Sequence, residues 1–426
     1  MPPPITPATL RTMESRSEPD VLQPRERHIV AAVRDLDGAN RRELAELTGL
    51  PRTTVTAAVA SLIARGLLTE TDGPAVTRRA GRPSPTVRID LSRKTVAAVE
   101  LGRRSQSVSL MGFDGRVLSR ADIEFDQAQP FEAVAAGLAA AADTVACDAT
   151  EVSAMVVSVT MPFRRGAGAP QVPMYSAGEM HFAPAKARRP NWLLTDPSAA
   201  LTEALGIPVV IENDINLAAL GESGHGAARG AHTAVYLSVV PGFGAGIVID
   251  GRLYRGAGGV AGELAHVSVR EDGDLCVCGN RGCYTTARRN GPSLADDIAS
   301  ALGRNMSLDE VIELAAEGDV AVRRWLADVG RSMAEPLAGF VTMLNPDLLV
   351  VDSALGSAAA PVVEGLRDTI ERRTSPMTFQ GLEIRPGQLT ASAIPAGAAV
   401  LAAQRYVDCL VGLTPSRRLG GLGAMG

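Results

Sequence analysis

The sequence predicts an α/β protein in which a small helical N-terminal domain precedes a larger domain of strands and helices. Apolar residues recur at helical spacing between residues 24 and 66, and short apolar runs alternate with helical stretches from residue 95 onward. The length of 426 residues exceeds one small domain, at roughly 150 residues per domain. With 46% apolar and 21% charged residues, the composition excludes a wholly disordered chain.

Charge is unevenly distributed along the chain. Residues 1–94 contain 15 Lys or Arg and 11 Asp or Glu, whereas the whole chain contains 42 Lys or Arg and 47 Asp or Glu. A basic N-terminal part on an acidic remainder indicates an anionic partner for the N-terminal part. Chance clustering of charges is the alternative that this observation leaves open.

The chain carries no targeting signal that we recognise. Residues 1–20 are rich in proline and polar side chains and predict a disordered tail, and the glycine-rich residues 414–426 predict a flexible one. The N-terminus lacks the basic-then-apolar pattern of a secretory signal, and no apolar run reaches the ~18 residues of a membrane helix. We therefore expect a cytoplasmic protein.

The first two helices are marked by their boundary residues. A helical pattern begins after Pro24. Asn40 is a suitable N-cap for the second helix, with Glu43 in the capping-box position three residues later. We expect Leu44 and Leu47 to form the buried side of this helix.

A glycine turn at Gly49 separates the second helix from a third, which begins at Pro51. The expected buried side of the third helix is Val55, Val59, Leu62 and Ile63. Three short helices with a glycine turn before the third form a helix-turn-helix. A small helical bundle that binds no nucleic acid is the alternative.

A wing follows the third helix. Strands are predicted at Leu67-Leu68 and at 86–91, with an arginine-rich segment at 78–83 between them. Such a segment can enter a narrow minor groove, although a solvated linker has the same composition. Small and hydroxyl side chains on the third helix suit the major groove. The candidate DNA-binding residues are Arg52, Thr53, Thr54, Thr56, Arg79 and Arg82.

The larger domain alternates strands and helices. The predicted strands are 96–101, 107–111, 116–118, 151–159, 209–211, 234–239, 246–249 and 347–351, and the predicted helices include 131–145 and a closing helix from Pro395 to about Leu410.

Three of the five cysteines fall within eight residues, at Cys276, Cys278 and Cys283, ten residues after His266. In a reducing cytosol this density indicates a metal site rather than a disulfide. Three thiolates and one imidazole complete a closed, structural zinc tetrahedron, with buried free thiols as the alternative. Cys147 and Cys409 stand alone, and we expect them to be core residues.

The helix-turn-helix, the cysteine loop and several other segments resemble the ROK family of repressors and sugar kinases, over residues 25–410. The resemblance implies structural Zn²⁺ at the four residues just named. It also matches Pro208-Val209-Val210-Ile211-Glu212-Asn213-Asp214 and Gly262-Glu263-Leu264-Ala265-His266 to sugar-binding segments, and Asn191 to a weaker one. The implied effector-binding residues are Asn191, Asn213, Asp214, Glu263 and His266.

The sequence departs from the pattern of the family's ATP-using members. Their Asp-x-Gly-Gly-Thr turn is Glu100-Leu101-Gly102-Arg103-Arg104 here, and a later Gly-Gly is Asp352-Ser353. Pro241 replaces a threonine of a third phosphate element, and Thr285 replaces a sugar-binding glutamate. These changes predict that the chain is not an enzyme, while the binding of a nucleotide or free phosphate stays open.

The resemblance implies an N-terminal winged helix-turn-helix at 21–91 and a two-lobed, actin-like (ribonuclease-H-like) domain at 92–413. We therefore expect a DNA-binding transcriptional repressor, a homodimer or homotetramer, that responds to a sugar or sugar phosphate. Two alternatives remain: a ROK sugar kinase with a regulatory head, and an effector-independent DNA-binding protein.

Overall fold

The computed structural model describes residues 22–71, 85–92, 94–101, 106–124, 130–145, 152–160, 163–164, 172–173, 197–239, 242–276, 278–287, 303 and 306–413. Its contacts divide the chain into two units. The first, termed the head, comprises residues 1–94, 112–114 and 402–426, and the second, termed the body, comprises Thr95–Met111 and Gly115–Leu401. The predicted tails at 1–20 and 414–426 lie outside the described residues.

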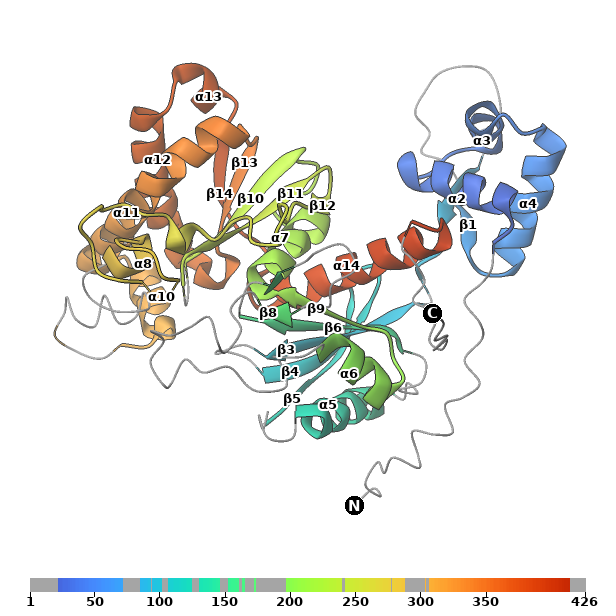
Figure 1. The fold of residues 1–426 in the computed structure, drawn as a ribbon, viewed down its shortest axis with the longest axis horizontal. Helices are drawn as coiled ribbons and strands as arrows, with labels where there is room; N and C mark the ends of the chain where they lie inside the picture. Colours follow the sequence, from blue (N-terminus) through green and yellow to red (C-terminus); the bar gives the residue numbers. More distant parts are fainter. Residues whose placement is uncertain are drawn as a thin grey trace, which may run out of the picture. The chain divides into compact units, whose positions relative to one another are not determined.

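The described part of the head is a winged helix-turn-helix (Figure 1). Its elements are α2 (Pro24–Asp35), α3 (Arg41–Thr48), α4 (Arg52–Ala64), β1 (Leu68–Thr71) and β2 (Thr86–Ile89). The two strands pair antiparallel, with Leu68 opposite Ile89. The three helices pack on one core, in which Ile29, Leu44 and Val59 are fully buried.

Helix α3 confirms the predicted cap but not the predicted buried face. The Asn40 side chain accepts hydrogen bonds from the backbone N–H groups of Arg42 and Glu43, and the Glu43 side chain accepts one from the N–H of Asn40. Leu44 is buried and Ala45 packs beside it, whereas Leu47 is 60% exposed. The expectation for Leu47 is wrong because it lies roughly 160° around the helix from Ala45, at ~100° per residue.

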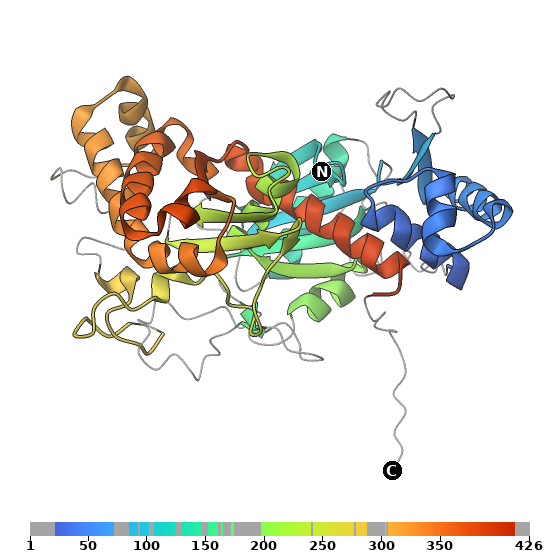
Figure 2. The same cartoon turned by 90° about the horizontal axis from the view of Figure 1, so that it is seen from above.

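The last helix, α14 (Ala393–Leu410), contributes to both units. Figure 2 shows it as one unbroken helix. Its first half belongs to the body, and its second half belongs to the head, where Tyr406 and Leu410 pack into the head core. Arg34 of α2 forms an ion pair with Asp408 at 3.6 Å. Cys409 is exposed, contrary to expectation, because Val407 and Leu410 occupy the buried side of this turn.

One sheet of the body has the order β5-β4-β3-β6-β9. Its strands are β3 (Thr95–Leu101), β4 (Gln106–Gly112), β5 (Val117–Asp122), β6 (Val152–Val159) and β9 (Val209–Asn213). β3, β6 and β9 run parallel, and β4 and β5 form an antiparallel edge. Helices α5 (Pro130–Thr144) and α6 (Pro197–Leu205) supply apolar residues to the core beneath it (Figure 1).

The second sheet of the body has the order β12-β11-β10-β13-β14. Its strands are β10 (Thr233–Ser238), β11 (Gly244–Ile249), β12 (Arg252–Leu253), β13 (Leu348–Val351) and β14 (Glu383–Pro386). The helices nearest it in sequence are α7 (Asp214–His225), α10 (Leu308–Glu317), α11 (Val320–Leu344), α12 (Ala359–Arg373) and α13 (Pro376–Gln380). α11 and α12 pack closely together and supply much of the core on this sheet.

Short elements complete the described body: β7 (Phe163–Arg164), β8 (Val172–Pro173), α8 (Tyr284–Ala287), and the 3-10 helices η5 (Leu264–His266), η6 (Ser353–Ala358) and η7 (Thr390–Ser392). Within the described ranges, no helix combines the length and apolarity that crossing a membrane requires. Two five-stranded sheets with flanking helices give the predicted two-lobed body, and the ends of β9, β10 and β13 lead to its candidate site.

Candidate metal and ligand sites

Four side chains of types that can bind a metal ion converge after β12. His266 lies at the end of η5, and Cys276, Cys278 and Cys283 lie on the loop that follows. This loop folds back on itself, since Cys276 N–H donates to the carbonyl of Asn280 and Leu275 bridges to Arg281. Gly282 has a φ of 60°, and a Cβ there would lie 1.6 Å from the carbonyl oxygen of Arg270. Only glycine allows the loop to close this tightly.

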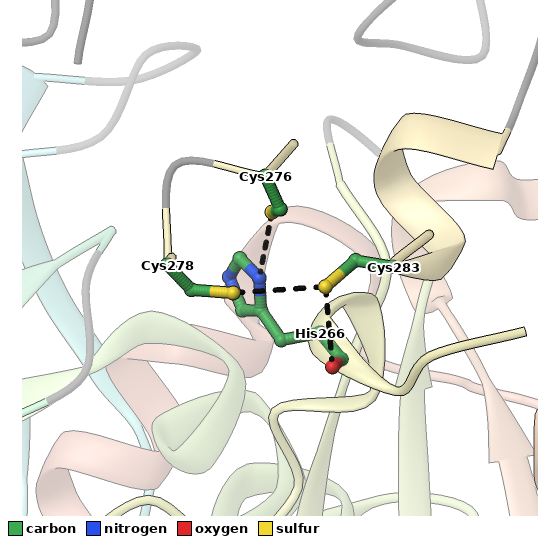
Figure 3. Close-up of side chains that lie close together, drawn as sticks. All are labelled: His266, Cys276, Cys278 and Cys283. Atoms are coloured by element: carbon green, nitrogen blue, oxygen red, sulfur yellow. Dashed lines mark hydrogen bonds between the residues drawn. The ribbon is translucent and has the colours of Figure 1, made fainter. Parts of the chain in front are cut away.

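The four side chains fit a tetrahedral metal site (Figure 3). Their donor atoms all lie within 4.8 Å of one another. The sulfurs of Cys278 and Cys283 are 3.6 Å apart, and the sulfur of Cys276 is 3.4 Å from Nδ1 of His266. A tetrahedron with Zn–S bonds of ~2.3 Å and Zn–N bonds of ~2.0 Å has edges of roughly 3.8 and 3.6 Å. The predicted set of four ligands is thus brought together at the required spacing.

Without a cation, the Cys283 thiol of this cluster stays protonated at neutral pH. Burial raises the pKa of the Cys283 thiol to about 12, and its neighbours Cys278 and Cys276 add to the shift. Burial also lowers the pKa of His266 and keeps its imidazole neutral. Metal ligation requires thiolates and a neutral imidazole. A bound cation would supply the charge that three adjacent thiolates need.

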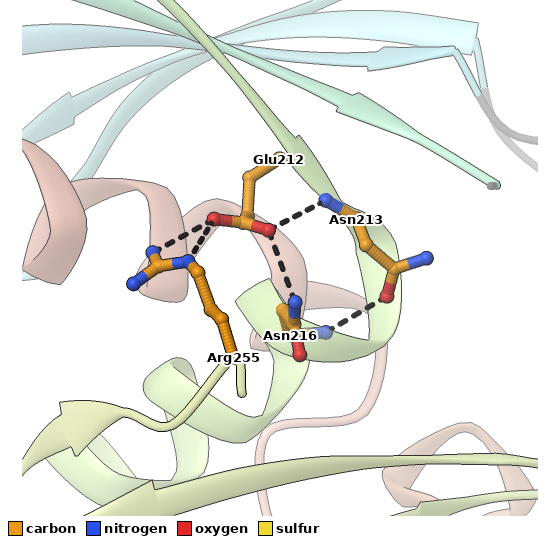
Figure 4. Close-up of polar contacts among 4 residues, drawn as sticks. All are labelled: Glu212, Asn213, Asn216 and Arg255. Atoms are coloured by element: carbon orange, nitrogen blue, oxygen red, sulfur yellow. Dashed lines mark hydrogen bonds and ion pairs between the residues drawn. The ribbon is translucent and has the colours of Figure 1, made fainter. Parts of the chain in front are cut away.

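A buried ion pair joins the end of β9 to the loop that follows β12 (Figure 4). Glu212, at the end of β9, is 3% exposed. Its Oε2 accepts hydrogen bonds from Nε and Nη2 of Arg255, at 3.0 and 2.8 Å. Its Oε1 accepts from the backbone N–H of Asn213 and from the side chain of Asn216, each at 3.0 Å. The loop after β12 is thereby held against the start of α7.

The same loop is held against β11 by its backbone. Gly262 has a φ of 91°, and its carbonyl accepts a hydrogen bond of 2.8 Å from the N–H of Ala245. A Cβ at this position would lie 1.9 Å from the carbonyl oxygen of Ala245, so a larger residue would push the loop away. Gly262 and Arg255 together hold in place the segment that carries Glu263 and His266.

Asp214 lines a cavity of about 1010 Å³ in the body. It is the first residue of α7, directly after β9, and its Oδ1 accepts a hydrogen bond from the N–H of Ile215. The cavity wall combines residues of both sheets, including Glu100 of β3 and Tyr236 of β10. A cavity of this size holds a small-molecule ligand.

The carboxyls of Asp214 and Glu263 both have raised pKa values. Burial raises the pKa of Asp214 to about 7, and the charges of Asp352 and Glu100 add to the shift. Burial likewise raises the pKa of Glu263 to about 7, with a contribution from Asp214. Groups that can accept or donate a proton near neutral pH suit the recognition of sugar hydroxyls.

The remaining effector candidates differ in their position. Oδ1 of Asn213 accepts hydrogen bonds from the N–H groups of Ile215 and Asn216, so this atom caps α7 (Figure 4). Thr285 is exposed on α8. Asn191 lies outside the described residues, as do Arg103, Arg104 and Pro241.

The predicted DNA-binding face is exposed on α4. Arg52, Thr53 and Thr56 are exposed, Thr54 is half-buried, and Val55 points into the core. The first two turns of α4 therefore present a charged group and two hydroxyls. Arg79 and Arg82 of the expected wing lie outside the described residues.

The pair formed by Glu212 and Arg255 was not expected from the sequence. A glutamate directly after the apolar run Val209–Ile211 is a usable signal, because a buried carboxylate needs a cation or several donors. Its partner is 43 residues away, and only the fold identifies it.

Asp214 should lower the stability of the protein at neutral and alkaline pH. Its folded pKa of about 7 lies above the ordinary value of 3.8, so its contribution to stability falls as the pH rises from about 4 to 7. Asp214→Asn should therefore stabilise the protein more at pH 8 than at pH 5, by roughly 1–2 kcal/mol after screening. Thermal unfolding across this pH range measures the difference. Asp143→Asn, on the exposed side of α5, is the control, and an equal effect of Asp214→Asn at both pH values would contradict the expectation.

Comparison with known proteins agrees with this architecture. The model of the ROK family matches residues 96–405, and that of the MarR family matches residues 22–79. The chain is 26% identical over 220 residues to the xylose repressor of Bacillus subtilis (strain 168), covering 52% of this chain and 57% of that protein. It is 28% identical to the transcriptional repressor Mlc of Escherichia coli (strain K12), and this match covers 50% of this chain and 54% of that protein. The chain thus spans little more than half the length of these curated relatives.

A longer match is to the dual regulator NagC of Escherichia coli (strain K12), at 26% identity over 78% of this chain and 80% of that protein. Among solved structures, a ROK family transcriptional regulator, homolog of E. coli MLC, matches 91% of this chain and 98% of its own, with a TM-score of 0.71 and 22% identity. A ROK hexokinase from Thermus thermophilus matches 74% of this chain over 99% of its own, with a TM-score of 0.55 and 29% identity. Because the ROK family model covers residues 96–405, well over half of the chain, the protein belongs to the ROK family.

Proposed function

We propose that this protein is a DNA-binding transcriptional regulator of the repressor type, acting in the cytoplasm, whose body senses a sugar. The observation that carries the proposal is the exposed face of α4 in a winged helix-turn-helix, joined to a ROK body. The Thermus hexokinase is matched over 99% of its length by 74% of this chain, so about a quarter of this chain lies outside that match. The repressor names of several curated relatives agree with this assignment.

The head would read DNA through α4. A helix of this type enters the major groove with its first turns, where small and hydroxyl side chains approach base edges. Arg52, Thr53, Thr54 and Thr56 are the contacts we propose on this helix, and Arg79 and Arg82 those of the wing. Two heads on a symmetric operator require a homodimer or homotetramer.

The body would bind its effector in the cavity that contains Asp214. Of the proposed effector residues, Asp214 lines this cavity. Glu263, Asn213, His266 and Asn191 are the further donors and acceptors that we propose for the sugar hydroxyls. The xylose and N-acetylglucosamine in the names of relatives make these sugars the first probes. Effector binding would shift the arrangement of the body and alter the affinity of the heads for DNA.

The cysteine cluster would hold a structural zinc ion. Three thiolates and an imidazole, with no position left open, are the ligand set of structural rather than catalytic zinc. The ion would fix the loop that ends at α8 and, through His266, the position of Glu263.

A sugar kinase is the second candidate function. The hexokinase at 29% identity favours it, and a carboxyl with a pKa of about 7, such as Asp214, suits a general base. Against it stand the altered segments at Glu100–Arg104 and Asp352-Ser353. Sugar-dependent ATP hydrolysis is the measurement that separates the two functions.

The purified protein should contain about one zinc ion per chain. Cys278→Ser should lose the metal and lower the unfolding temperature of the body, because folding of the loop is coupled to binding. Metal analysis by mass spectrometry and calorimetry measure both effects. Cys409→Ser, at an exposed cysteine of α14, should leave both unchanged. Zinc-free protein from a chelator-free purification would refute the assignment.

Thr56→Ala should weaken binding to an operator obtained by in vitro selection. A lost contact in the groove costs about 1–3 kcal/mol, or roughly 5- to 150-fold in affinity. Gel-shift titration gives the change. Ser61→Ala removes an exposed hydroxyl from the same helix, roughly 140° around the axis, and should bind like the parent. Equal affinities of parent and Thr56→Ala would exclude this face of α4.

A free sugar should release the parent protein from its operator, and Asp214→Ala should prevent that release while DNA binding persists. Losing hydrogen bonds to a charged group costs ~1.5–3 kcal/mol, so effector affinity should fall roughly tenfold to a hundredfold. Gel shifts with and without xylose, N-acetylglucosamine or glucose provide the readout. ATP hydrolysis that depends on the sugar and disappears in Asp214→Ala would establish the kinase instead.

A further inference from the structure

The cavity that contains Asp214 is larger than a monosaccharide requires. Its volume of about 1010 Å³ is at the upper end of the ~300–1,000 Å³ typical of ligand pockets. Part of its wall comes from the end of β10 and from the segment after β13, with Tyr236, Ser238, Asp352, Ser353 and Ala354. The chemical groups that this part of the wall can bind determine which effectors fit the cavity.

Four donors, three of them from residues of this wall, converge on the carboxylate of Asp352. Its Oδ1 accepts hydrogen bonds from the hydroxyl of Tyr236 and the N–H of Ala354, both at 3.0 Å. Its Oδ2 accepts from the N–H of Val239 at 3.0 Å and from the hydroxyl of Ser238 at 3.4 Å. The Asp352 side chain is thereby held at the wall, and the residue is 3% exposed.

Two backbone N–H groups and two hydroxyls that point at one oxyanion form a cradle of the kind that binds phosphate or another oxyanion. In this protein the oxyanion is covalently part of the chain. A phosphate group from a ligand could use these donors only by displacing Asp352, and the displaced carboxylate would then lack its hydrogen bonds.

The charges of the wall act in the same direction. Its acidic residues include Glu100, Asp122, Asp214 and Asp309 besides Asp352. Arg120, which also lines the cavity, forms ion pairs with Glu100 at 3.3 Å and Asp122 at 3.7 Å. The charge of Asp352 contributes to the raised pKa of Asp214, which indicates a negative potential where the effector would bind. A phosphate dianion would be repelled by this wall.

We propose that Asp352 is a built-in occupant of an oxyanion cradle, and that the cavity therefore accepts unphosphorylated sugars and excludes sugar phosphates and nucleotides. This inference rests on the proposed function for the identity of the effector. The cradle itself depends only on the contacts of Asp352 with Tyr236, Ser238, Val239 and Ala354. The choice of effector and the cradle are therefore tested by separate experiments.

The first experiment compares matched ligands on the parent protein. Xylose, N-acetylglucosamine and glucose are each paired with their terminal phosphate ester, and binding is measured by thermal shift and calorimetry. One free sugar should bind, and its ester should bind at least roughly tenfold more weakly. An ester that binds more tightly than its free sugar would overturn the proposal. If no compound of either kind binds, the sensor function fails, and the second experiment decides about the cradle.

The second experiment opens the cradle. Asp352→Gly removes the carboxylate and frees its donors, so this variant should bind inorganic phosphate at millimolar concentration where the parent does not. Calorimetry and phosphorus NMR line broadening detect the binding. Asp309→Ala removes an acidic side chain from the same wall outside the cradle and should behave like the parent. Folded Asp352→Gly protein without phosphate binding would overturn the cradle, and if this variant does not fold, the matched ligands on the parent decide.

Discussion

The ion pair between Glu212 and Arg255 joins the two segments that carry Asp214 and Glu263. Glu212 follows an apolar strand into the interior, where its carboxylate accepts four hydrogen bonds, two of them from Arg255. A buried pair of this kind adds little net stability compared with apolar residues of the same shape, but removal of one partner costs about 3–5 kcal/mol. Its contribution is therefore geometric: it holds the loop after β12 against α7. The cluster of His266 with Cys276, Cys278 and Cys283 lies directly beyond this constrained segment.

The sequence predicted well those features that depend on neighbouring residues. The capping box at Asn40 and Glu43, the turn at Gly49 and the convergence of Cys276, Cys278 and Cys283 with His266 all follow from local spacing and chemistry. Two local expectations were wrong. Leu47 is exposed, because periodicity alone does not say which apolar face of a short helix meets the core. Cys409 is exposed, because the apolar character of a cysteine does not say which side of its helix is buried.

Features that depend on distant residues could not be predicted in the same way. Asp352 was recognisable as a departure from a glycine pattern, but its role depends on Tyr236 and Ser238, more than 100 residues earlier. These residues meet only because β10 and β13 pair in parallel, with Leu237 opposite Val351. The register of a parallel pair is a property of the whole sheet, and the sequence on its own did not supply it.

The division of α14 between the two units has a consequence for the order in which the protein can mature. The head's helix-turn-helix is synthesised first, yet its core includes Tyr406 and Leu410, and Asp408 forms an ion pair with Arg34. These groups leave the ribosome more than 300 residues after α4. During translation part of the head core therefore stays uncovered until the whole body, which ends at Leu401, has been made. A ribosome that stalls within the body would release a chain whose head lacks part of its core, so that completion of the head's fold is coupled to completion of the body.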